Sequence, residues 1–308
     1  MSDGGTVLGF PACMRNVTRH DPRAQAKRPA FRDTTESAPG RESRTRDKHE
    51  HGEESYRGHD RLTNRVALVT GADSGIGRAV AVAFAREGAD VAISYLNEHE
   101  EAKVTERLVT AAGRRALLIP GDLSERSTCD RIVDATVGAF GRIDILVNNA
   151  AYRGRAVEKF EEIDDDRIEQ AFRINVIAMF HLVRRALPHM REGSSIINVA
   201  SIQAYHPSAA ILDYAATKGA IVTLTKGFAE EVIKRGIRAN AIATGPAWIP
   251  LVVEPFPRAE GRSFVERSPL DHPASPADIA PAFVFLACDE SRYVNGEVLG
   301  LISGTSAA

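Results

Sequence analysis

Short apolar runs that alternate with amphipathic segments after residue 65 constrain the fold of this 308-residue chain more than any other feature. Seven runs have the length of a strand buried on both faces, at residues 66–70, 90–95, 115–119, 143–147, 195–199, 237–243 and 298–302. Between them apolar residues recur at helical spacing, as in Ile76, Val80 and Phe84. The alternation predicts an α/β fold with a doubly wound, seven-stranded parallel sheet.

Composition divides the chain near residue 60. The first 60 residues hold few apolar side chains and nearly balanced charge, which predicts a largely disordered polar arm over 1–60 and a single domain over 61–308. The arm's histidines lack the regular spacing of metal ligands, so we expect solvated side chains and no metal site. They are His20, His49, His51 and His59.

Charge and cysteine content exclude several classes of protein. The chain has 39 Lys and Arg against 41 Asp and Glu, which gives no excess charge to attract nucleic acid or a membrane surface. Cys13, Cys129 and Cys288 are widely spaced and odd in number, as expected of separate thiols in a reducing compartment. No apolar run is long enough to span a membrane, and residues 6–14 are a poor secretory signal. We therefore expect a soluble, cytoplasmic protein without nucleic-acid or membrane partners.

A glycine-rich turn lies between the first predicted strand and the first predicted helix. Gly71, Gly75 and Gly77 let the chain turn sharply and bring backbone N–H groups near a ligand. The helix N-terminus that follows favours negative charge, such as a pyrophosphate. In this position the turn predicts a Rossmann-type dinucleotide site at the carboxyl edge of the sheet.

Further motifs follow in a characteristic order. Asn148, Asn149 and Ala150 come after the fourth strand, Ser201 comes after the fifth, and Tyr214 begins a Y-x-x-x-K motif. Together with the glycine turn, this set resembles the short-chain dehydrogenase/reductase family over about residues 50–308. Stretches such as HGEESYRG and SIQAYHPSAAILDYAATK resemble the diverging, glucose-dehydrogenase-like branch of its bacterial members.

The resemblance implies an NAD(P)-dependent oxidoreductase that transfers a hydride between nicotinamide and a small alcohol or carbonyl substrate. Tyr214 and Lys218 lie four residues apart, so both project from one helical face, and an ammonium beside a phenol favours the phenolate. A phenol pKa lowered toward 7 would suit Tyr214 as acid/base. Ser201 would hydrogen-bond the substrate oxygen, and Asn175 would position a water that relays the proton.

The family resemblance also implies which residues contact the cofactor. They are Thr70, Gly71, Ser74, Gly75, Ile76, Gly77, Asp122, Leu123, Asn148, Ala150, Tyr214, Lys218 and Gly245. Structural alternatives stay open: Ser201 as a turn cap, Asn175 as a buried amide, and Asp122 as a cap of the helix that follows. Asn148 matches a residue that also braces the sheet.

The chain departs from the family pattern at several positions. Thr244 stands where a proline is usual, and Ile249 replaces a threonine that would bond the nicotinamide carboxamide. Alanine at 151 and serine at 303 stand where glycines are usual. These changes motivate an alternative, a catalytically weak or inactive dinucleotide-binding paralogue or sensor.

Cofactor, substrate and assembly are indicated less directly. The second strand ends without a carboxylate before Glu98, and Arg78 could approach a 2′-phosphate. Both features favour NADP, whereas Asp73 in the glycine turn favours NAD.

Residues 248–276 are expected to form a substrate lid, whose Trp248 could cover the ligand. Apolar residues on the helix at 213–234 and on the one before it favour a homotetramer, with a dimer as the alternative.

Overall fold

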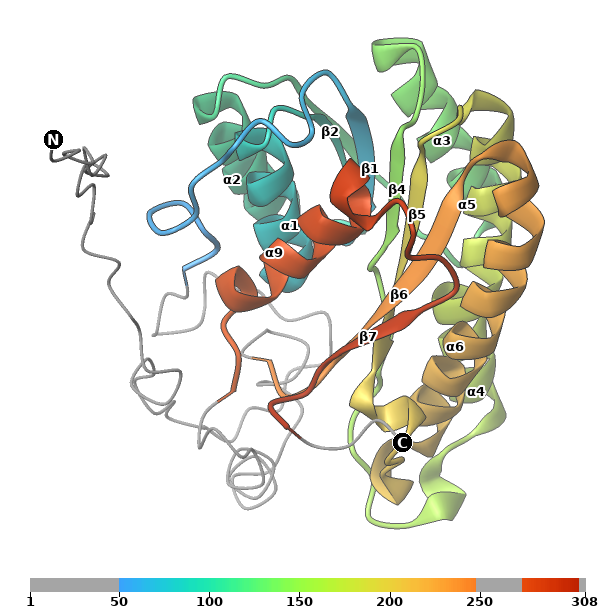
Figure 1. Ribbon diagram of the computed structural model, residues 1–308. Helices are drawn as coiled ribbons and strands as arrows, with labels where there is room; N and C mark the ends of the chain where they lie inside the picture. The colour runs from blue at the N-terminus through green and yellow to red at the C-terminus, as the bar shows by residue number, and fades with distance from the viewer. Residues whose placement is uncertain (1–49, 248–272, 305–308) are drawn as a thin grey trace, which may run out of the picture.

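The computed structural model describes residues 50–247 and 273–304. Their strands are β1 (Val66–Thr70), β2 (Asp90–Tyr95), β3 (Ala116–Pro120), β4 (Ile145–Asn148), β5 (Ser195–Ser201), β6 (Arg238–Thr244) and β7 (Val298–Leu301). They form a seven-stranded parallel sheet in the order β3-β2-β1-β4-β5-β6-β7 (Figure 1). The strand order reverses beside β1, so the predicted doubly wound sheet is confirmed. Ligands of such sheets bind at the carboxyl edge near this reversal.

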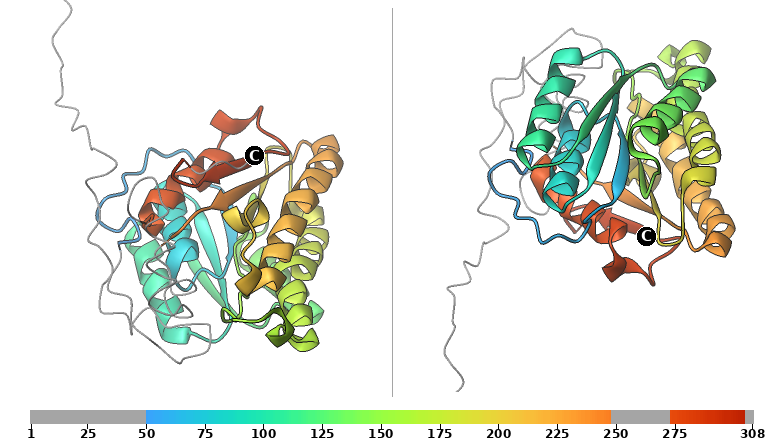
Figure 2. Two further views of the ribbon diagram at one scale, coloured as in Figure 1. Left: turned by 90° about the horizontal axis from the view of Figure 1, so that it is seen from below. Right: turned by 90° about the horizontal axis from the view of Figure 1, so that it is seen from above.

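Helices cover both faces of the sheet. The longer ones are α1 (Gly75–Arg86), α2 (His99–Ala111), α3 (Arg126–Phe140), α4 (Asp165–Phe172), α5 (Ala178–Ala186), α6 (Leu212–Val232) and α9 (Pro276–Ala287). A π-helical turn at Arg173–Ile177 joins α4 to α5. Helices α1, α2 and α9 lie on one face, and α3, α5 and α6 lie on the other (Figure 2).

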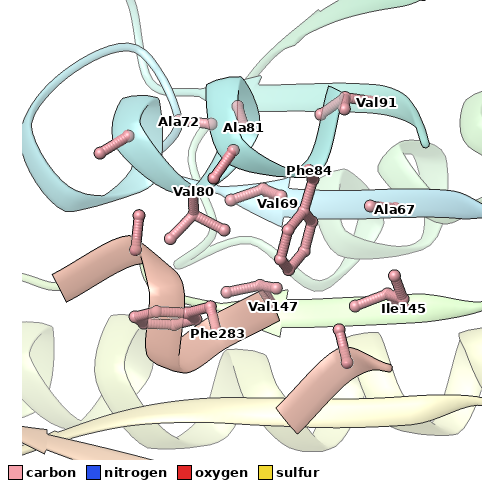
Figure 3. Packing of buried hydrophobic residues seen from close by; sticks show 14 of the residues in the cluster. Ala67, Val69, Ala72, Val80, Ala81, Phe84, Val91, Ile145, Val147 and Phe283 are labelled. Carbon is pink, nitrogen blue, oxygen red and sulfur yellow. The ribbon is translucent and has the colours of Figure 1, made fainter. Parts of the chain in front are cut away.

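The core explains why the strands consist of short apolar runs. Phe84 of α1 and Phe283 of α9 are fully buried and lie close to Val69, Ile145 and Val147 of the sheet (Figure 3). A second cluster fills the opposite face, so central strands are buried on both sides. The prediction of two buried faces is wrong for the edge strands, which have one neighbour each: the middle residues of β7 are exposed, and β3 is fully buried only at Ile119.

Two strands extend beyond their predicted ends in a way that matters for the site. The sequence predicts strands at 195–199 and 237–243, whereas β5 continues to Ser201 and β6 to Thr244. Their last residues pair in parallel register, Ser201 with Thr244. Both residues therefore lie at the carboxyl edge of the sheet.

Residues 50–61, here called the strap, are bound to the end of α1. The Tyr56 hydroxyl donates to Glu87 at 2.5 Å, the His59 N–H donates to it at 2.8 Å, and the Arg61 guanidinium donates at 2.7 Å. Glu87 is fully buried. His51, which we expected to be solvated, is also almost fully buried. The predicted disordered arm is therefore wrong for residues 50–60, because polar contacts fix a segment poor in apolar side chains. The rest of the arm, residues 1–49, lies outside the described residues.

Other sequence predictions concern absences or lie beyond these ranges. No helix of the described residues has the length and apolar character needed to cross a membrane. Within the same residues no cluster of His, Cys, Asp and Glu suitable for a metal ion is found. Most of the predicted lid at 248–276, including Trp248 and Ile249, lies outside the described residues.

Candidate active site

The turn between β1 and α1 forms an open cradle of backbone groups. Gly71 has a φ of +62°, and a Cβ at Gly77 would lie 2.0 Å from the Gly71 carbonyl oxygen, so the turn requires glycine. No side chain caps α1 at Ser74, and its first turn holds no acidic residue. The N–H groups at this helix end are thus available to an anion, which fits the pyrophosphate of a dinucleotide.

A cleft runs from this cradle across the carboxyl edge of the sheet. Ten of the predicted cofactor residues line it, namely Gly71, Ser74, Gly75, Ile76, Gly77, Asp122, Leu123, Ala150, Tyr214 and Lys218. Sequence reasoning did not assign a site role to several other residues that line it, among them Ser94, Tyr95, Tyr152, Gln170 and Ile174. Ser94 and Tyr95 end β2, Tyr152 lies in the loop after β4, and Gln170 and Ile174 lie in α4 and the π-helical turn after it; the signal in the sequence for the first three was this closeness to strand ends.

The three remaining predicted cofactor residues support the cleft from behind. The Thr70 hydroxyl accepts from the backbone N–H groups of Asn149 and Ala150, which fixes the end of β4 beside the cradle. Asn148 donates to Asn198 on the neighbouring strand at 2.8 Å, so it braces the sheet. The Gly245 N–H donates to the Leu301 carbonyl at 2.8 Å.

Tyr214, Ser201 and Lys218 meet at one end of the cleft. The Ser201 side chain lies close enough to the Tyr214 phenol to act on its pKa, while its own hydroxyl donates to the Thr244 carbonyl at 3.5 Å. The Lys218 Nζ lies 5.2 Å from the centre of the Tyr214 ring and donates to the Val199 carbonyl at 2.7 Å. Ser201 also accepts from the Gln203 N–H at 3.3 Å, so the turn-cap role coexists with the contact to Tyr214. The predicted acid/base group is therefore buried beside its two predicted partners.

The electrostatics of Tyr214 differ from the expectation. Burial raises the pKa of Tyr214 above its usual value, although the Arg153 charge and the Ser201 side chain act in the opposite direction. Burial also lowers the pKa of Lys218 to about 7. The expected lowering of the Tyr214 pKa by Lys218 is thus wrong in this structure, because desolvation outweighs the nearby charges. Arg153, which is 3% exposed, is the cation that favours the phenolate.

Asn175 lies fully buried in the π-helical turn behind the cleft. Its side-chain amide donates to the Tyr152 carbonyl at 2.8 Å and to the Thr217 hydroxyl at 3.0 Å. Its oxygen accepts from the Tyr152 N–H at 2.7 Å. These contacts match the structural alternative, an amide that ties the loop after β4 to α6. The water-relay role stays a prediction.

The other end of the cleft would face an adenosine. The Ser94 hydroxyl is buried, lines the cleft and has no hydrogen-bond partner among the described residues, which fits a ribose hydroxyl. Arg78 does not project freely toward this end, because its guanidinium pairs with Glu101 at 2.7 Å. Burial raises the pKa of Asp73 to about 6. Asp122 lines the cleft and accepts from the Ser124 N–H at 2.8 Å, in the turn before α3; the alternative that it caps this helix is wrong, because the N-cap position of α3 is Glu125.

Comparisons with known proteins agree with this geometry. A family model described as "Enoyl-(Acyl carrier protein) reductase" matches residues 71–306. "NADPH-dependent aldehyde reductase 1, chloroplastic" of Arabidopsis thaliana is 44% identical over 85% of this chain and 93% of its own length. "Glucose and ribitol dehydrogenase" of Daucus carota is 44% identical over 86% of this chain and 92% of its own length.

A solved structure is also similar to this chain. A short-chain dehydrogenase from Burkholderia cenocepacia in complex with NADP superposes with a TM-score of 0.75 at 33% identity, covering 79% of this chain and 98% of the other. Fold and cleft define a dinucleotide-binding oxidoreductase. The chain belongs to the short-chain dehydrogenase/reductase family of NAD(P)-dependent enzymes, in the glucose-dehydrogenase-like branch that the sequence predicted.

Proposed function

We propose that this enzyme interconverts a small carbonyl compound and its alcohol, with Tyr214 as the acid/base that donates the proton when the carbonyl is reduced. The observation that carries the proposal is the buried Tyr214 side chain, which lines the cleft together with Lys218, whose Nζ lies 5.2 Å from the centre of the Tyr214 ring. The raised pKa of Tyr214 keeps the phenol protonated at neutral pH, which is the form that protonates a carbonyl oxygen. Ser201 would hydrogen-bond the same oxygen and stabilise its developing charge. The bound nicotinamide would supply the hydride.

Of the two roles expected for Lys218, this proposal keeps the contact with the cofactor and drops the lowering of the Tyr214 pKa. Its Nζ is fixed by the Val199 carbonyl between Tyr214 and the floor of the cleft. From there it would hold the nicotinamide ribose hydroxyls, as the family resemblance implies. Asn175 would keep the loop at Tyr152 in place, beside the substrate end of the cleft.

NADP(H) is the proposed cofactor. The name of the Arabidopsis relative states NADPH dependence, and the Burkholderia structure contains NADP. In this chain β2 is followed by Leu96 and Asn97, with no carboxylate to repel a 2′-phosphate before Glu98. Fluorescence titration should show NADPH binding at least about tenfold tighter than NADH. Tighter binding of NADH would contradict the assignment.

The proposed substrates are aldehydes, sugars or polyols, the classes that the relatives' names mention. Absorbance at 340 nm with an aromatic aldehyde, glucose and ribitol, each in its reactive direction, should show turnover with at least one of them. Binding of NADPH without turnover in any assay would instead favour the alternative, an inactive dinucleotide-binding paralogue or sensor. Thr244, in place of the usual proline, lines the cleft and motivates that alternative.

We also propose a soluble cytoplasmic homotetramer, with a dimer as the alternative. Apolar side chains are exposed on α5, on α6 and in the π-helical turn before α5: Phe180 of α5 is 42% exposed, Leu212 at the start of α6 is 38% exposed, and Ile177 in the turn is 44% exposed. Association would remove this surface from water. Light scattering at micromolar concentration should give a multiple of 33.4 kDa, and a monomer would contradict the proposal.

A further inference from the structure

A buried ion pair joins α4 to the first turn of α6. The Arg167 Nε and Nη2 donate to the two carboxylate oxygens of Asp213 at 2.8 and 2.9 Å. The side chains are 10% and 0% exposed, so this two-point contact is shielded from water. Asp213 directly precedes Tyr214, and Arg167 lies one turn before Gln170, which lines the cleft.

The same ion pair contacts the loop after β4. Gly154 has a φ of +68°, and a Cβ there would lie 2.8 Å from the Arg167 Nε, so the loop lies directly against the guanidinium. Two residues earlier, the backbone of Tyr152 is fixed by Asn175. Further on, the Val157 N–H donates to the Ala210 carbonyl just before α6, at 3.0 Å. The loop at 152–157 is thus held between α4 and the start of α6.

We propose that the Arg167–Asp213 ion pair is a positioning device, which sets the first turn of α6 and the loop at 152–157 in register around the Tyr214 hydroxyl. This proposal rests on the proposed role of Tyr214 as proton donor. The loop carries Tyr152, which lines the cleft, and Arg153, whose buried charge acts on Tyr214. A shift of this loop or of α6 would separate these groups from the substrate oxygen.

Stability alone is a weak reason for such a pair. Taking two charges out of water is costly, and apolar residues of similar size are often as stabilising as a buried ion pair. What the pair adds is fixed geometry, because a guanidinium and a carboxylate bind in one plane through two hydrogen bonds. Here that geometry lies next to Tyr214 and against Gly154.

The test compares Asp213→Asn and Arg167→Met with wild type. The first variant leaves a positive charge near the site and the second leaves a negative one. Arg167→Lys is the conservative variant, since it keeps the charge and one hydrogen bond. The matched control is Asp134→Asn, which breaks the two-point ion pair with Arg185 on the outer side of α3 and α5. Thermal melting establishes that each variant is folded at the assay temperature.

The readouts are kcat and KM with NADPH and the panel carbonyl that wild type reduces fastest, together with NADPH affinity by fluorescence. Asp213→Asn and Arg167→Met should both lower kcat by about tenfold or more, while NADPH affinity stays within about twofold. Arg167→Lys should recover part of the loss, and Asp134→Asn should behave as wild type. If kcat rose in one of these two variants and fell in the other, the effect would be one of charge, and the proposal would be overturned. Losses of kcat no larger than that of Asp134→Asn would also overturn it.

Hydrogen exchange separates this proposal from the proposed function. Peptides covering residues 150–158 and the start of α6 should exchange faster in Asp213→Asn and Arg167→Met than in Asp134→Asn. If wild type reduces no compound of the panel, the proposed function fails, and the exchange result decides on the ion pair alone. Unchanged exchange in these peptides would overturn the positioning role.

Discussion

The two ends of α1 differ in whether their polar groups have partners within the chain. At the N-terminal end no side chain caps the helix, and the glycine turn leaves backbone donors facing the cleft. At the C-terminal end Glu87 is fully buried and accepts hydrogen bonds from Tyr56, His59 and Arg61. One helix thus keeps donors open for an anionic ligand and closes its other end with the chain's own strap.

This difference separates binding from stability along a single element. Donors at the N-terminal end gain a partner when an anion binds there, so changes there should affect cofactor affinity most. Glu87 already has its partners within the chain, so changes there should affect unfolding most. The predictions below test this separation.

The largest effect is expected for Gly77→Ala. A Cβ at this position would lie 2.0 Å from the Gly71 carbonyl oxygen, so the turn has to open and the N–H groups lose their alignment. NADPH affinity should fall by about a hundredfold or more in a fluorescence titration. Gly138→Ala is the control, because a Cβ in that part of α3 meets nothing within 4 Å. An affinity within about threefold of wild type would contradict the role of the turn.

Glu87→Ala should lower stability and spare binding. Breaking a buried ion pair costs about 3 kcal/mol or more, which at this size lowers Tm by about 6 °C or more. NADPH affinity should stay near the wild-type value. Glu290→Ala is the control, since this side chain lies 3.8 Å from Arg61 and is 62% exposed. A Tm change for Glu87→Ala no larger than that of the control would contradict the account.

The same carboxylate predicts a pH dependence. Burial raises the pKa of Glu87, but hydrogen bonds from Arg61 and Tyr56 outweigh it and lower the pKa from 4.5 to about 2. The stabilisation is therefore present above pH 4.5 and is lost as the pH falls toward 2. The difference in Tm between wild type and Glu87→Gln should shrink over this interval. A difference that stays constant would show that the charge of Glu87 is not responsible.

The smallest effect is expected for removal of residues 1–48, whose composition offers little apolar surface. Tm should change by less than about 4 °C. A deletion that continues through residue 61 removes the strap and should lower Tm by more than the shorter deletion does. Equal Tm values for the two deletions would show that the strap does not stabilise α1.

The parts of the fold that follow from sequence are those set by local pattern. The bounds of β1 and β2 match the predicted runs at 66–70 and 90–95, and both strands are buried along their whole length, as that prediction requires. The glycine turn and the Y-x-x-x-K spacing likewise brought Gly71, Tyr214 and Lys218 to one cleft.

Contacts between distant segments could not be predicted in this way. The strap binds Glu87 through polar groups about 26–31 positions away, and no periodicity marks such partners. The Arg167–Asp213 pair spans 46 positions for the same reason. Helical spacing placed Lys218 beside Tyr214, but the pKa of Tyr214 depends on burial that only the packed structure reveals.

Tyr214→Phe tests the central claim most directly, because it removes the hydroxyl and keeps the ring. With the panel compound that wild type turns over, absorbance at 340 nm should show kcat reduced by about a hundredfold or more. NADPH affinity, measured on the same preparation by fluorescence, should stay within about threefold of wild type. A variant that keeps the wild-type kcat would contradict the assignment of Tyr214 as the proton donor.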